Sequence, residues 1–397
     1  MIVVAGAGIA GLTAALAFAA RGFDVSVYER AARLEEAGAG LQLSPNATGI
    51  LERLGVLPLL LPLAIEPEAV VLRDARTLVE LARIPLGSLA KRRWKAPYLA
   101  LHRADLQSAL LARVRQENRI KLVTGSQISN VAPDAHGITV SVRKDGCVSE
   151  VTALLAVGAD GVRSSMRRLA GGAENRFAGQ VAWRSTVDLA SPAGLIIQRI
   201  CATDCVSAFL NPGFHLIVYP VRGGTAFNLA AFTVQSPAQE DDANPAALQA
   251  ALKKSGPALA KLAETCGPWT SWLIRTVDPA GRWTANGIAL IGDAAHAMTP
   301  FAAQGAAMAI EDAEMLAHHV ACRPYDMAGA LSAWELERKP RILRVARRGA
   351  INRVAWHAAG PVALARNLFL RMRSPESLAA DLDWLYGWEP PSIVQVQ

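Results

Sequence analysis

The chain opens with Met1-Ile-Val-Val-Ala-Gly6-Ala-Gly8-Ile-Ala-Gly11, continues as an apolar run to Arg21, and reaches Glu29 through Asp24-Val-Ser-Val-Tyr. The β-branched run at Ile2–Val4 predicts a buried parallel strand, followed by a helix and a second strand. Glycines at this spacing allow a tight turn, a close approach to a diphosphate and close packing of the helix. Glu29 ends the second strand, where a carboxylate can accept hydrogen bonds from a ribose 2′-OH. The stretch predicts a site for FAD or NAD rather than NADP. The alternative is a glycine-rich turn in an ordinary αβ unit.

Length and composition indicate a packed globular protein. The 397 residues leave room for two domains or one interrupted domain, and 52% of them are apolar. The apolar N-terminus lacks a basic flank, so we do not interpret it as a signal peptide, and no 18-residue apolar run predicts a membrane span. The five cysteines are scattered and form no zinc pattern, which favours a reducing, cytoplasmic location.

The net charge of +7 is unevenly distributed, because residues 338–373 hold ten basic residues and no acid. Such a segment could attract an anionic cofactor, an anionic substrate or a membrane surface. The alternative is a solvated helix face or an oligomer contact. Nucleic-acid binding is not expected, because aromatic residues do not interleave with the basic ones.

The first third of the chain predicts further cofactor contacts around the opening motif. A glycine-containing loop at Gly38–Gly40 leads to Gln42, and a helix begins at Pro45 and ends near Leu54. Residues 67–100 are typical of strands and a loop, the loop including Lys91–Trp94. A helix then follows with Asp105 as its expected N-cap, and Arg103 just before it could reach a phosphate or ribityl group.

Short strands are predicted at 120–126, 138–143 and 148–157, and a second strand–turn–helix follows around Asp160-Gly161, with serines that can cap its helix. From about 172 to 280 the pattern favours a mostly antiparallel sheet with turns at residues 211–213 and 222–224. We assign strands here to several apolar runs, including Leu195–Ile200, and one helix to Pro245–Thr265. This block predicts a separate substrate domain.

A third motif begins with the buried strand Ile288–Ile291 and carries Asp293 at its carboxyl end. Ligands of open α/β sheets lie beyond this end of the strands, so Asp293 is placed to hold a polyol. Pro300 marks a turn, and a helix rich in Gly and Ala starts near Gln304. A flat ring could lie against the N-terminal amides of that helix, which would stabilise negative charge on a reduced flavin.

Taken in order, these three motifs resemble those of the group A FAD-dependent aromatic hydroxylases, the superfamily of p-hydroxybenzoate hydroxylase. Within it the chain looks like salicylate hydroxylases, 3-hydroxybenzoate 6-hydroxylases and 6-hydroxynicotinate 3-monooxygenases. The resemblance implies an α/β fold in which a Rossmann-like FAD-binding domain is interleaved with a mostly antiparallel β-sheet substrate domain, with C-terminal helices. The expected FAD-binding domain is discontinuous (1–67, 102–171 and 281–345). The substrate domain is expected at 68–101 and 172–280, and a C-terminal helical segment at 346–397.

The resemblance also implies cofactor contacts. Glu29 would bind the adenosine ribose, Arg103 the diphosphate and ribityl region, and Asp293 the ribitol, while the Asp160 motif would serve both FAD and the pyridine nucleotide. The expected FAD-binding residues are Gly6, Gly8, Ala10, Gly11, Glu29, Arg30, Leu41, Gln42, Arg103, Asp160, Asp293, Pro300, Gly305, Ala306 and Ala307.

The implied reaction is aromatic hydroxylation. NADH or NADPH would reduce FAD, O2 would add to form a C4a-hydroperoxide, and an electron-rich ring of a small phenolic or N-heteroaromatic acid would attack the distal oxygen. The protein would orient the substrate, exclude water and deprotonate the phenol, with no metal. The sequence leaves open the substrate, the choice of NADH or NADPH, accompanying decarboxylation, and whether the chain forms a homodimer.

The expected catalytic residues are His215 and Tyr219, which lie four apart in a strand-like run. Period-2 geometry puts both on one face, and the pair could accept and relay a phenolic proton. The relatives resemble this His-x-x-x-Tyr arrangement, but Gln42 stands where hydroxynicotinate enzymes have a histidine base, which argues against that substrate. The alternative is a packed tyrosine and a histidine at a solvated edge of the sheet.

Other candidates have plain alternatives. His296 is expected to be structural beside the cofactor, and Arg184 either binds a substrate carboxylate or lies on the sheet surface. Cys201 and Cys205 either line the pocket or are inert buried thiols. A larger polycyclic substrate, an FAD-dependent dehydrogenase or reductase without oxygen insertion, and a non-catalytic FAD-binding protein are the competing functions. Product analysis and substrate-stimulated O2 uptake would separate them.

Overall fold

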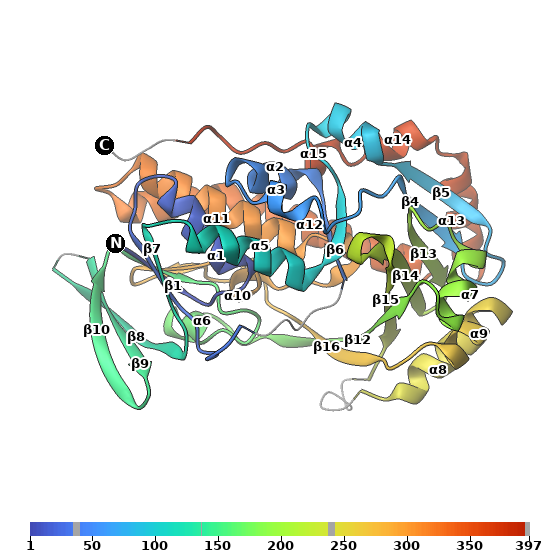
Figure 1. The fold of residues 1–397 in the computed structure, drawn as a ribbon, viewed down its shortest axis with the longest axis horizontal. Coiled ribbons are helices and arrows are strands. Elements are labelled where there is room, and N and C mark those ends of the chain that lie inside the picture. Colours follow the sequence, from blue (N-terminus) through green and yellow to red (C-terminus); the bar gives the residue numbers. More distant parts are fainter. Residues whose placement is uncertain (35–39, 136, 237–242, 394–397) are drawn as a thin grey trace.

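The structure is a computed structural model that describes residues 1–34, 40–135, 137–236 and 243–393. It is a mixed α/β fold with two large sheets at opposite ends of an elongated body (Figure 1). Gly38 of the predicted glycine-containing loop lies outside the described residues. In the described part of the chain, no helix combines the length and hydropathy needed to cross a bilayer.

The first large sheet has six strands and contains the opening motif. Its strands pair in parallel except at one edge, where β17 runs antiparallel to β18. In spatial order the strands are β17 (Thr284–Ala285), β18 (Ile288–Leu290), β11 (Leu155–Gly158), β1 (Ile2–Ala5), β2 (Val25–Tyr28) and β7 (Ile120–Val123). The carboxyl ends of β1, β11 and β18 therefore lie next to one another, as the three motifs require to meet at one site.

Helices α1 (Ile9–Ala19), α5 (Arg103–Arg115) and α11 (Gly305–Cys322) lie side by side against this sheet (Figure 1). Helix α1 is almost entirely buried, which its run of small and apolar residues permits. At Gly11 a Cβ would lie 1.9 Å from the Gly6 carbonyl oxygen, so only glycine lets α1 approach the turn this closely.

The second large sheet has seven strands, antiparallel except for the parallel pair β13–β4. In spatial order they are β16 (Thr270–Thr276), β12 (Arg176–Asp188), β15 (Ala226–Val234), β14 (Phe214–Val221), β13 (Val206–Asn211), β4 (Ala69–Asp74) and β5 (Glu80–Pro85). One face packs against α7 (Pro192–Ile200), α8 (Pro245–Lys254) and α9 (Pro257–Thr265). The other face, which carries His215 and Tyr219 on β14, is turned toward the rest of the molecule (Figure 1).

Smaller elements connect the two ends. The two-stranded sheet of β3 (Gly40–Leu43) and β6 (Leu99–His102) lies between the large sheets, and a three-stranded sheet of β8 (Ser126–Asp134), β9 (Gly137–Lys144) and β10 (Cys147–Ala153) lies at the far end. The short helices are α2 (Pro45–Arg53), α3 (Leu57–Leu60), α4 (Gly87–Trp94), α6 (Ser165–Leu169) and α10 (Asp293–His296), with single 3-10 turns at Arg222–Gly224 and Pro300–Ala302.

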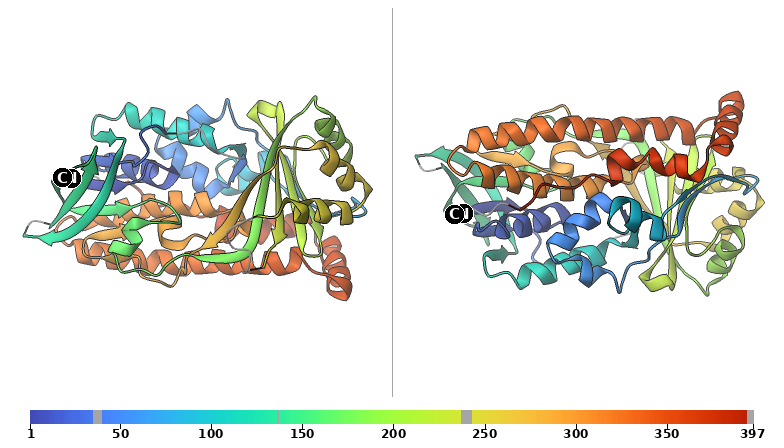
Figure 2. Two further views of the ribbon diagram at one scale, coloured as in Figure 1. Left: turned by 90° about the horizontal axis from the view of Figure 1, so that it is seen from below. Right: turned by 90° about the horizontal axis from the view of Figure 1, so that it is seen from above.

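The C-terminal part is helical, with α12 (Met327–Trp356), α13 (Gly360–Met372), α14 (Pro375–Ala380) and α15 (Asp383–Tyr386). Helix α12 runs along the length of the molecule, from the three-stranded sheet to the seven-stranded one (Figure 2). It continues without a break through residue 345, where the expected FAD-binding domain ends, and the division into domains stays a prediction.

Several local predictions were wrong. Leu195–Ile200 is helical, because Ser191 caps the helix with Pro192 in its first turn, and Ala193, Ile197 and Ile200 are buried on one face. The predicted single helix at 245–265 is two helices, because Gly256 has a φ of 117° and Pro257 starts a new one.

Three other elements also differ from expectation. Lys91–Trp94 belongs to α4, which buries Ala90 and Trp94 one turn apart. Residues 148–157 divide into β10 and β11, which belong to different sheets. Asp105 is not the N-cap of α5 but lies within its first turn, where a carboxylate still favours the helix dipole.

Candidate active site

A cleft of about 280 Å³ opens where β1 and β11 end. Its walls bring together residues from five separate stretches of the chain. Six of the predicted cofactor residues line it: Gly6, Gly8, Glu29, Arg30, Arg103 and Asp160. The cleft lies at the carboxyl edge of a parallel sheet, which is where ligands bind in open α/β folds.

The glycine turn leaves room in this cleft for a diphosphate. A Cβ on Gly8 would meet no atom within 4 Å, whereas a Cβ on Gly6 would lie 2.7 Å from the Ala159 carbonyl oxygen. The first backbone N–H groups of α1 have no partner within the helix, so they can bind an anion. The Glu29 carboxylate accepts hydrogen bonds from the backbone N–H groups of Ala7 (2.8 Å) and Ala31 (2.9 Å), which holds it at the cleft wall. These residues fit an adenosine diphosphate moiety.

Asp160 has a structural task at the same cleft. Its carboxylate accepts hydrogen bonds from Ser164, Ser165 and the backbone N–H of Met166, and so caps the start of α6. Of the neighbouring arginines, Arg163 and Arg168 line the cleft, while Arg167 is buried and donates only to backbone carbonyls. The motif therefore fixes the cleft wall and supplies two cations to it.

Arg103 connects the cleft to the rest of the predicted site. It interacts electrostatically with Asp293, whose side chain is solvent-exposed at the start of α10. Desolvation by the surrounding protein atoms raises the pKa of the Asp293 carboxyl, and the charges of His296 and Arg103 oppose that rise. Arg103 also faces Arg184 on β12, so two cations stand close together here. Such a pair favours a bound anion or hydrogen-bond acceptor.

Tyr219 lies at one end of the β14 face that is turned toward the rest of the molecule, beside residues predicted to line the flavin. Its hydroxyl makes a polar contact with the Gln42 side chain, and the Tyr98 hydroxyl donates to Gln42 Oε1 at 2.7 Å. Burial raises the pKa of Tyr219 strongly, although Arg184 and Gln42 oppose the rise. Tyr219 is therefore a neutral phenol at ordinary pH. On the neighbouring strand, Asn228 accepts from the backbone N–H of Gly40 at 2.7 Å.

Two buried donors beside Tyr219 have no partner among the described residues. They are Arg184 Nε and Asn228 Nδ2. The guanidinium of Arg184 lies over the ring of Trp272, 5.2 Å from its centroid, and burial lowers its pKa. Because an unsatisfied buried donor costs free energy, both groups favour a ligand with acceptor oxygens. Of the two alternatives for Arg184, a position on the sheet surface fits only in part, because the side chain is half-buried.

His215 lies at the other end of the same face and is enclosed by aromatic rings. It stacks on Phe232 at 4.4 Å between ring centroids and contacts Phe301 and Trp356, both at 5.1 Å. Phe301 follows Pro300, which is predicted to line the flavin. Nδ1 of His215 lies 2.8 Å from Nε2 of His357, so one ring donates to the other. Burial and the charge of His357 lower the pKa of His215 well below its ordinary value.

His215 and Tyr219 thus share one face, but they have different partners. Four residues of strand separate their Cα atoms by about 13 Å. His215 is 1% exposed, so it does not lie at a solvated edge of the sheet. A direct hydrogen bond between the pair is out of reach, and a ligand lying along β14 would contact both.

The remaining predicted cofactor residues surround this region from two sides. Leu41 and Gln42 lie on β3, and Pro300 lies in the turn before α11. Gly305, Ala306 and Ala307 form the first turn of α11, where a Cβ on Gly305 would meet no atom within 4 Å. Ala10 of α1 lies against Gly292, so the first and third motifs are in contact.

A buried ion network supports the first turns of α11. Glu311 binds Arg338 and Arg341 of α12 at 2.6 Å each, and Asp312 binds Arg338 at 2.9 Å and His296. Burial would raise the pKa of Asp312, but His296 and Arg338 outweigh burial and lower it. The predicted solvated basic face is thus wrong for Arg338, which is 1% exposed. His296 is buried in this network, an arrangement that fits a structural role.

Sequence reasoning did not find His357, Tyr98 or the partners of Arg338. Only the partners of Arg338 had a signal in the sequence, because acidic residues in a buried helix need cations from another element. Three cysteines are buried, including Cys201 and Cys205, and Cys147 and Cys322 are exposed. Burial raises the pKa of Cys201 to about 11, so its thiol is inert. Within the described ranges, no cluster of side chains could hold a metal ion.

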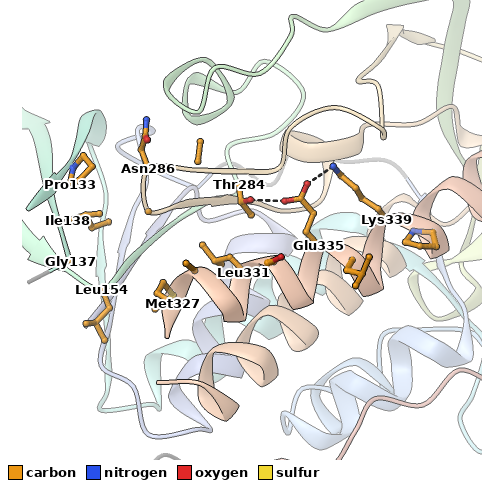
Figure 3. A pocket seen from close by; sticks show the side chains of 16 residues that line it. Pro133, Gly137, Ile138, Leu154, Thr284, Asn286, Met327, Leu331, Glu335 and Lys339 are labelled. Atoms are coloured by element: carbon orange, nitrogen blue, oxygen red, sulfur yellow. Dashed lines mark hydrogen bonds and ion pairs between the residues drawn. The ribbon is translucent and has the colours of Figure 1, made fainter. Parts of the chain in front are cut away.

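A larger cavity of about 800 Å³ lies elsewhere, between the three-stranded sheet and α12 (Figure 3). Glu335 lies in its wall, accepts a hydrogen bond from Thr284 and pairs with Lys339. None of the predicted site residues lines this cavity.

Comparison with known proteins agrees with these observations. Residues 1–348 match the family model described as an FAD binding domain. The chain is 32% identical over 393 residues to a 3-hydroxybenzoate 6-hydroxylase of Polaromonas naphthalenivorans, covering 98% of this chain and 96% of the relative. It is 33% identical over 359 residues to a 6-hydroxynicotinate 3-monooxygenase of Bordetella bronchiseptica, covering 87% and 89%.

Among solved structures, an arginine-to-glutamine variant of HpxO of Klebsiella pneumoniae complexed with FAD has a TM-score of 0.82 at 25% identity, covering 97% of this chain and 98% of that one. A salicylate hydroxylase substrate complex has a TM-score of 0.78 at 21% identity and covers 98% and 95%, which shows the fold alone. This chain belongs to the FAD-binding family of the group A flavin hydroxylases and is a flavoprotein monooxygenase.

Proposed function

We propose that the protein is an FAD-dependent, NAD(P)H-consuming monooxygenase that hydroxylates a small phenolic or N-heteroaromatic acid. One observation carries the proposal. The two segments predicted to line the flavin contact opposite ends of the β14 face, Gln42 at Tyr219 and Phe301 at His215. A ring bound along β14 would therefore lie beside the flavin. When bound, FAD would accept electrons from NAD(P)H and activate O2.

The chain's own residues would bind and orient both molecules. Gly8 and the first amides of α1 would receive the diphosphate, Glu29 the adenosine ribose, and Arg103 with Asp293 the ribityl chain. The first turn of α11, from Gly305 to Ala307, would lie against the flavin ring and favour negative charge on it. The roles of Gly8, Glu29 and Arg103 rest on the shape and chemistry of the cleft, and that of Asp293 rests on its interaction with Arg103.

The substrate roles divide between the two ends of β14. His215 is neutral because its pKa is low, so a ring nitrogen can accept the phenolic proton. Tyr219 stays protonated and can donate a hydrogen bond to a substrate oxygen. Arg184 Nε and Asn228 Nδ2 are further donors without partners among the described residues, which supports an acid as substrate. Removal of the phenolic proton makes the ring electron-rich.

The decisive experiment is a panel of aromatic acids tested with the flavin-loaded protein. We expect at least one to accelerate NADH or NADPH consumption and to gain one oxygen atom by mass spectrometry. Oxygen uptake without a hydroxylated product across the panel would overturn the proposal, and conversion of polycyclic compounds alone would overturn its substrate class. The same assay gives the preferred pyridine nucleotide and reveals any decarboxylation.

Two variants test the substrate roles. Tyr219→Phe is expected to slow hydroxylation while flavin reduction stays near the wild-type rate. Arg184→Gln is expected to raise KM for a phenolic acid and to leave KM for the matching neutral phenol unchanged. Equal effects on both substrates would contradict a carboxylate contact. The proposal also includes the division into an FAD-binding and a substrate domain, a cytoplasmic location and a homodimer. Size-exclusion chromatography tests whether the protein is a homodimer.

A further inference from the structure

His357 contacts His215 from a helix that is far away in the sequence. It follows the last residue of α12, and its backbone carbonyl accepts a hydrogen bond from Gly213 N in the turn before β14. Its Nε2 lies 2.8 Å from His215 Nδ1. The end of α12 is thus fixed against β14 by one backbone bond and one bond between imidazoles.

His357 also lines a cavity of about 400 Å³ that is distinct from the cofactor cleft. The cavity lies between the end of α12, the start of α13 and the neighbouring strands β12 and β15 of the seven-stranded sheet. Its wall includes Gln180, Val234, Arg353, Val354, His357 and Val362. His357 is half-buried, so its ring extends from the enclosed His215 to this wall.

We propose that His215 and His357 form a two-imidazole relay that conducts the substrate's phenolic proton from the active site to solvent in this cavity. The inference rests on the proposed function, because it assigns the exit route for the proton that hydroxylation requires. Among the described residues, no carboxylate lines this cavity, so none would hold the proton on His357. Arg353 is the charged group that acts on His357. The residues that β12, β15 and α13 contribute to the cavity wall are uncharged.

The proton balance is complete within the two rings. The substrate O–H bond breaks and its proton binds Nε2 of His215, a nitrogen that makes no hydrogen bond among the described residues. His215 Nδ1 then gives its proton to Nε2 of His357, and His357 Nδ1 releases one proton to water. Both rings end neutral with exchanged tautomers. When the product oxygen is reprotonated, His215 Nε2 gives up its proton to that oxygen, His357 Nε2 returns a proton to His215 Nδ1, and water supplies one to His357 Nδ1, which resets both rings. Because burial lowers the pKa of both rings, neither retains the proton as a stable cation.

Three variants separate relay from support. His357→Gln can keep a hydrogen bond to His215 but cannot pass a proton. His357→Ala opens space continuous with the cavity, where free imidazole can enter. Val354→Ala is the matched control, because it removes a similar volume from the same wall without touching the His215 bond.

The first readout is the ionisation of a chromophoric phenolic acid, 3-hydroxy-4-nitrobenzoate, on binding to the holoenzyme. We expect phenolate to appear at least tenfold more slowly in both His357 variants than in the wild type and in Val354→Ala. Added imidazole should restore the rate in His357→Ala alone. Wild-type ionisation rates in His357→Ala without imidazole would overturn the relay.

The second readout needs no substrate, so it separates failure of the relay from failure of the proposed function. Exchange of the His215 ring N–H with water, followed by nitrogen-15 NMR of histidine-labelled holoenzyme, should be at least tenfold slower in His357→Gln than in the wild type. Equal exchange rates would overturn the relay whatever the enzyme hydroxylates.

Discussion

The Tyr219 hydroxyl lies where a side chain on Gly40 would begin, since a Cβ at residue 40 would come within 2.6 Å of it. The same Cβ would lie 2.4 Å from Cγ of Asn228. Glycine at this position therefore lets β3 approach β14 closely enough for Gln42 to reach Tyr219. The contact between the predicted flavin-facing strand and the predicted substrate face depends on that one missing methyl group.

Gly40→Ala tests this dependence directly. We expect the methyl group to displace Tyr219 and Asn228, and product formation per NAD(P)H consumed to fall several-fold while FAD stays bound. Gly49→Ala is the matched control, because its Cβ would meet only Ala96 at 3.8 Å. Coupling is measured as product formed against nicotinamide oxidised. Wild-type coupling in Gly40→Ala would show that β3 has room to move.

Gly8 and Gly11 separate cofactor binding from folding. A Cβ at Gly8 meets nothing in the protein but projects into the cleft, so Gly8→Ala should weaken FAD binding at least tenfold with little loss of stability. A Cβ at Gly11 meets the Gly6 carbonyl oxygen at 1.9 Å, so Gly11→Ala should destabilise the fold itself. FAD titration and urea unfolding of both variants measure the two effects. Unchanged FAD affinity in Gly8→Ala would contradict the placement of the diphosphate.

Asp293→Ala should lower flavin content or flavin reactivity, because the variant loses the carboxylate that faces Arg103 at the predicted ribitol position. The ratio of flavin to protein absorbance measures the content. Asp278→Ala is the control, because the exposed Asp278 carboxylate accepts a hydrogen bond only from the nearby backbone N–H of Ala280 among the bonds described for it. Normal flavin content together with normal turnover in Asp293→Ala would refute the role.

Arg338→Gln should be strongly destabilising, because Glu311 and Asp312 would remain buried with an incomplete set of partners. Breaking a buried ion network by removing one partner costs about 3–5 kcal/mol. Arg347→Gln, at an exposed position of the same helix, should change the free energy of unfolding by no more than about 0.5 kcal/mol. Urea unfolding of both variants decides the matter, and equal midpoints would show that the network contributes nothing.

Acid should destabilise the protein through its two facing imidazoles. Burial lowers the pKa of His357 from 6.5 to about 4 and that of His215 in the same direction. The unfolded chain therefore binds more protons than the folded one below pH 6.5. Stability present above that pH is lost as the pH falls toward 4, by at most about 1.4 kcal/mol per pH unit for each group. His357→Gln should have a shallower dependence of Tm on pH over this range, and an identical dependence would contradict the assignment.

Local sequence patterns predicted much of the fold and several residues that line the cofactor cleft. Gly6, Gly8 and Glu29 lie within one βαβ unit, so their spacing alone predicts a shared wall, and the structure brings Arg103 and Asp160 to the same cleft. Their roles toward FAD stay predictions. The apolar run Leu195–Ile200 was misassigned because a short apolar run fits a buried strand and a buried helix equally well.

The partners of the catalytic candidates could not be predicted in this way. His215 and His357 are 142 residues apart in sequence, and no periodicity links them. Arg338 belongs to a basic segment that resembles a solvated surface until α11 and α12 are placed side by side. Such contacts depend on how whole elements pack, and a single sequence contains no local signal for that arrangement.

Helix α12 carries the buried Arg338 and the half-buried Arg341 near its middle, and His357 follows its last residue. The number of residues between Arg341 and His357 therefore sets where the second imidazole lies. Removing one residue between Arg341 and the end of the helix would turn His357 by about 100° and draw it back by about 1.5 Å while the ion pairs stay in place. Chain length in this interval is therefore fixed by geometry, although its exposed side chains are free to vary.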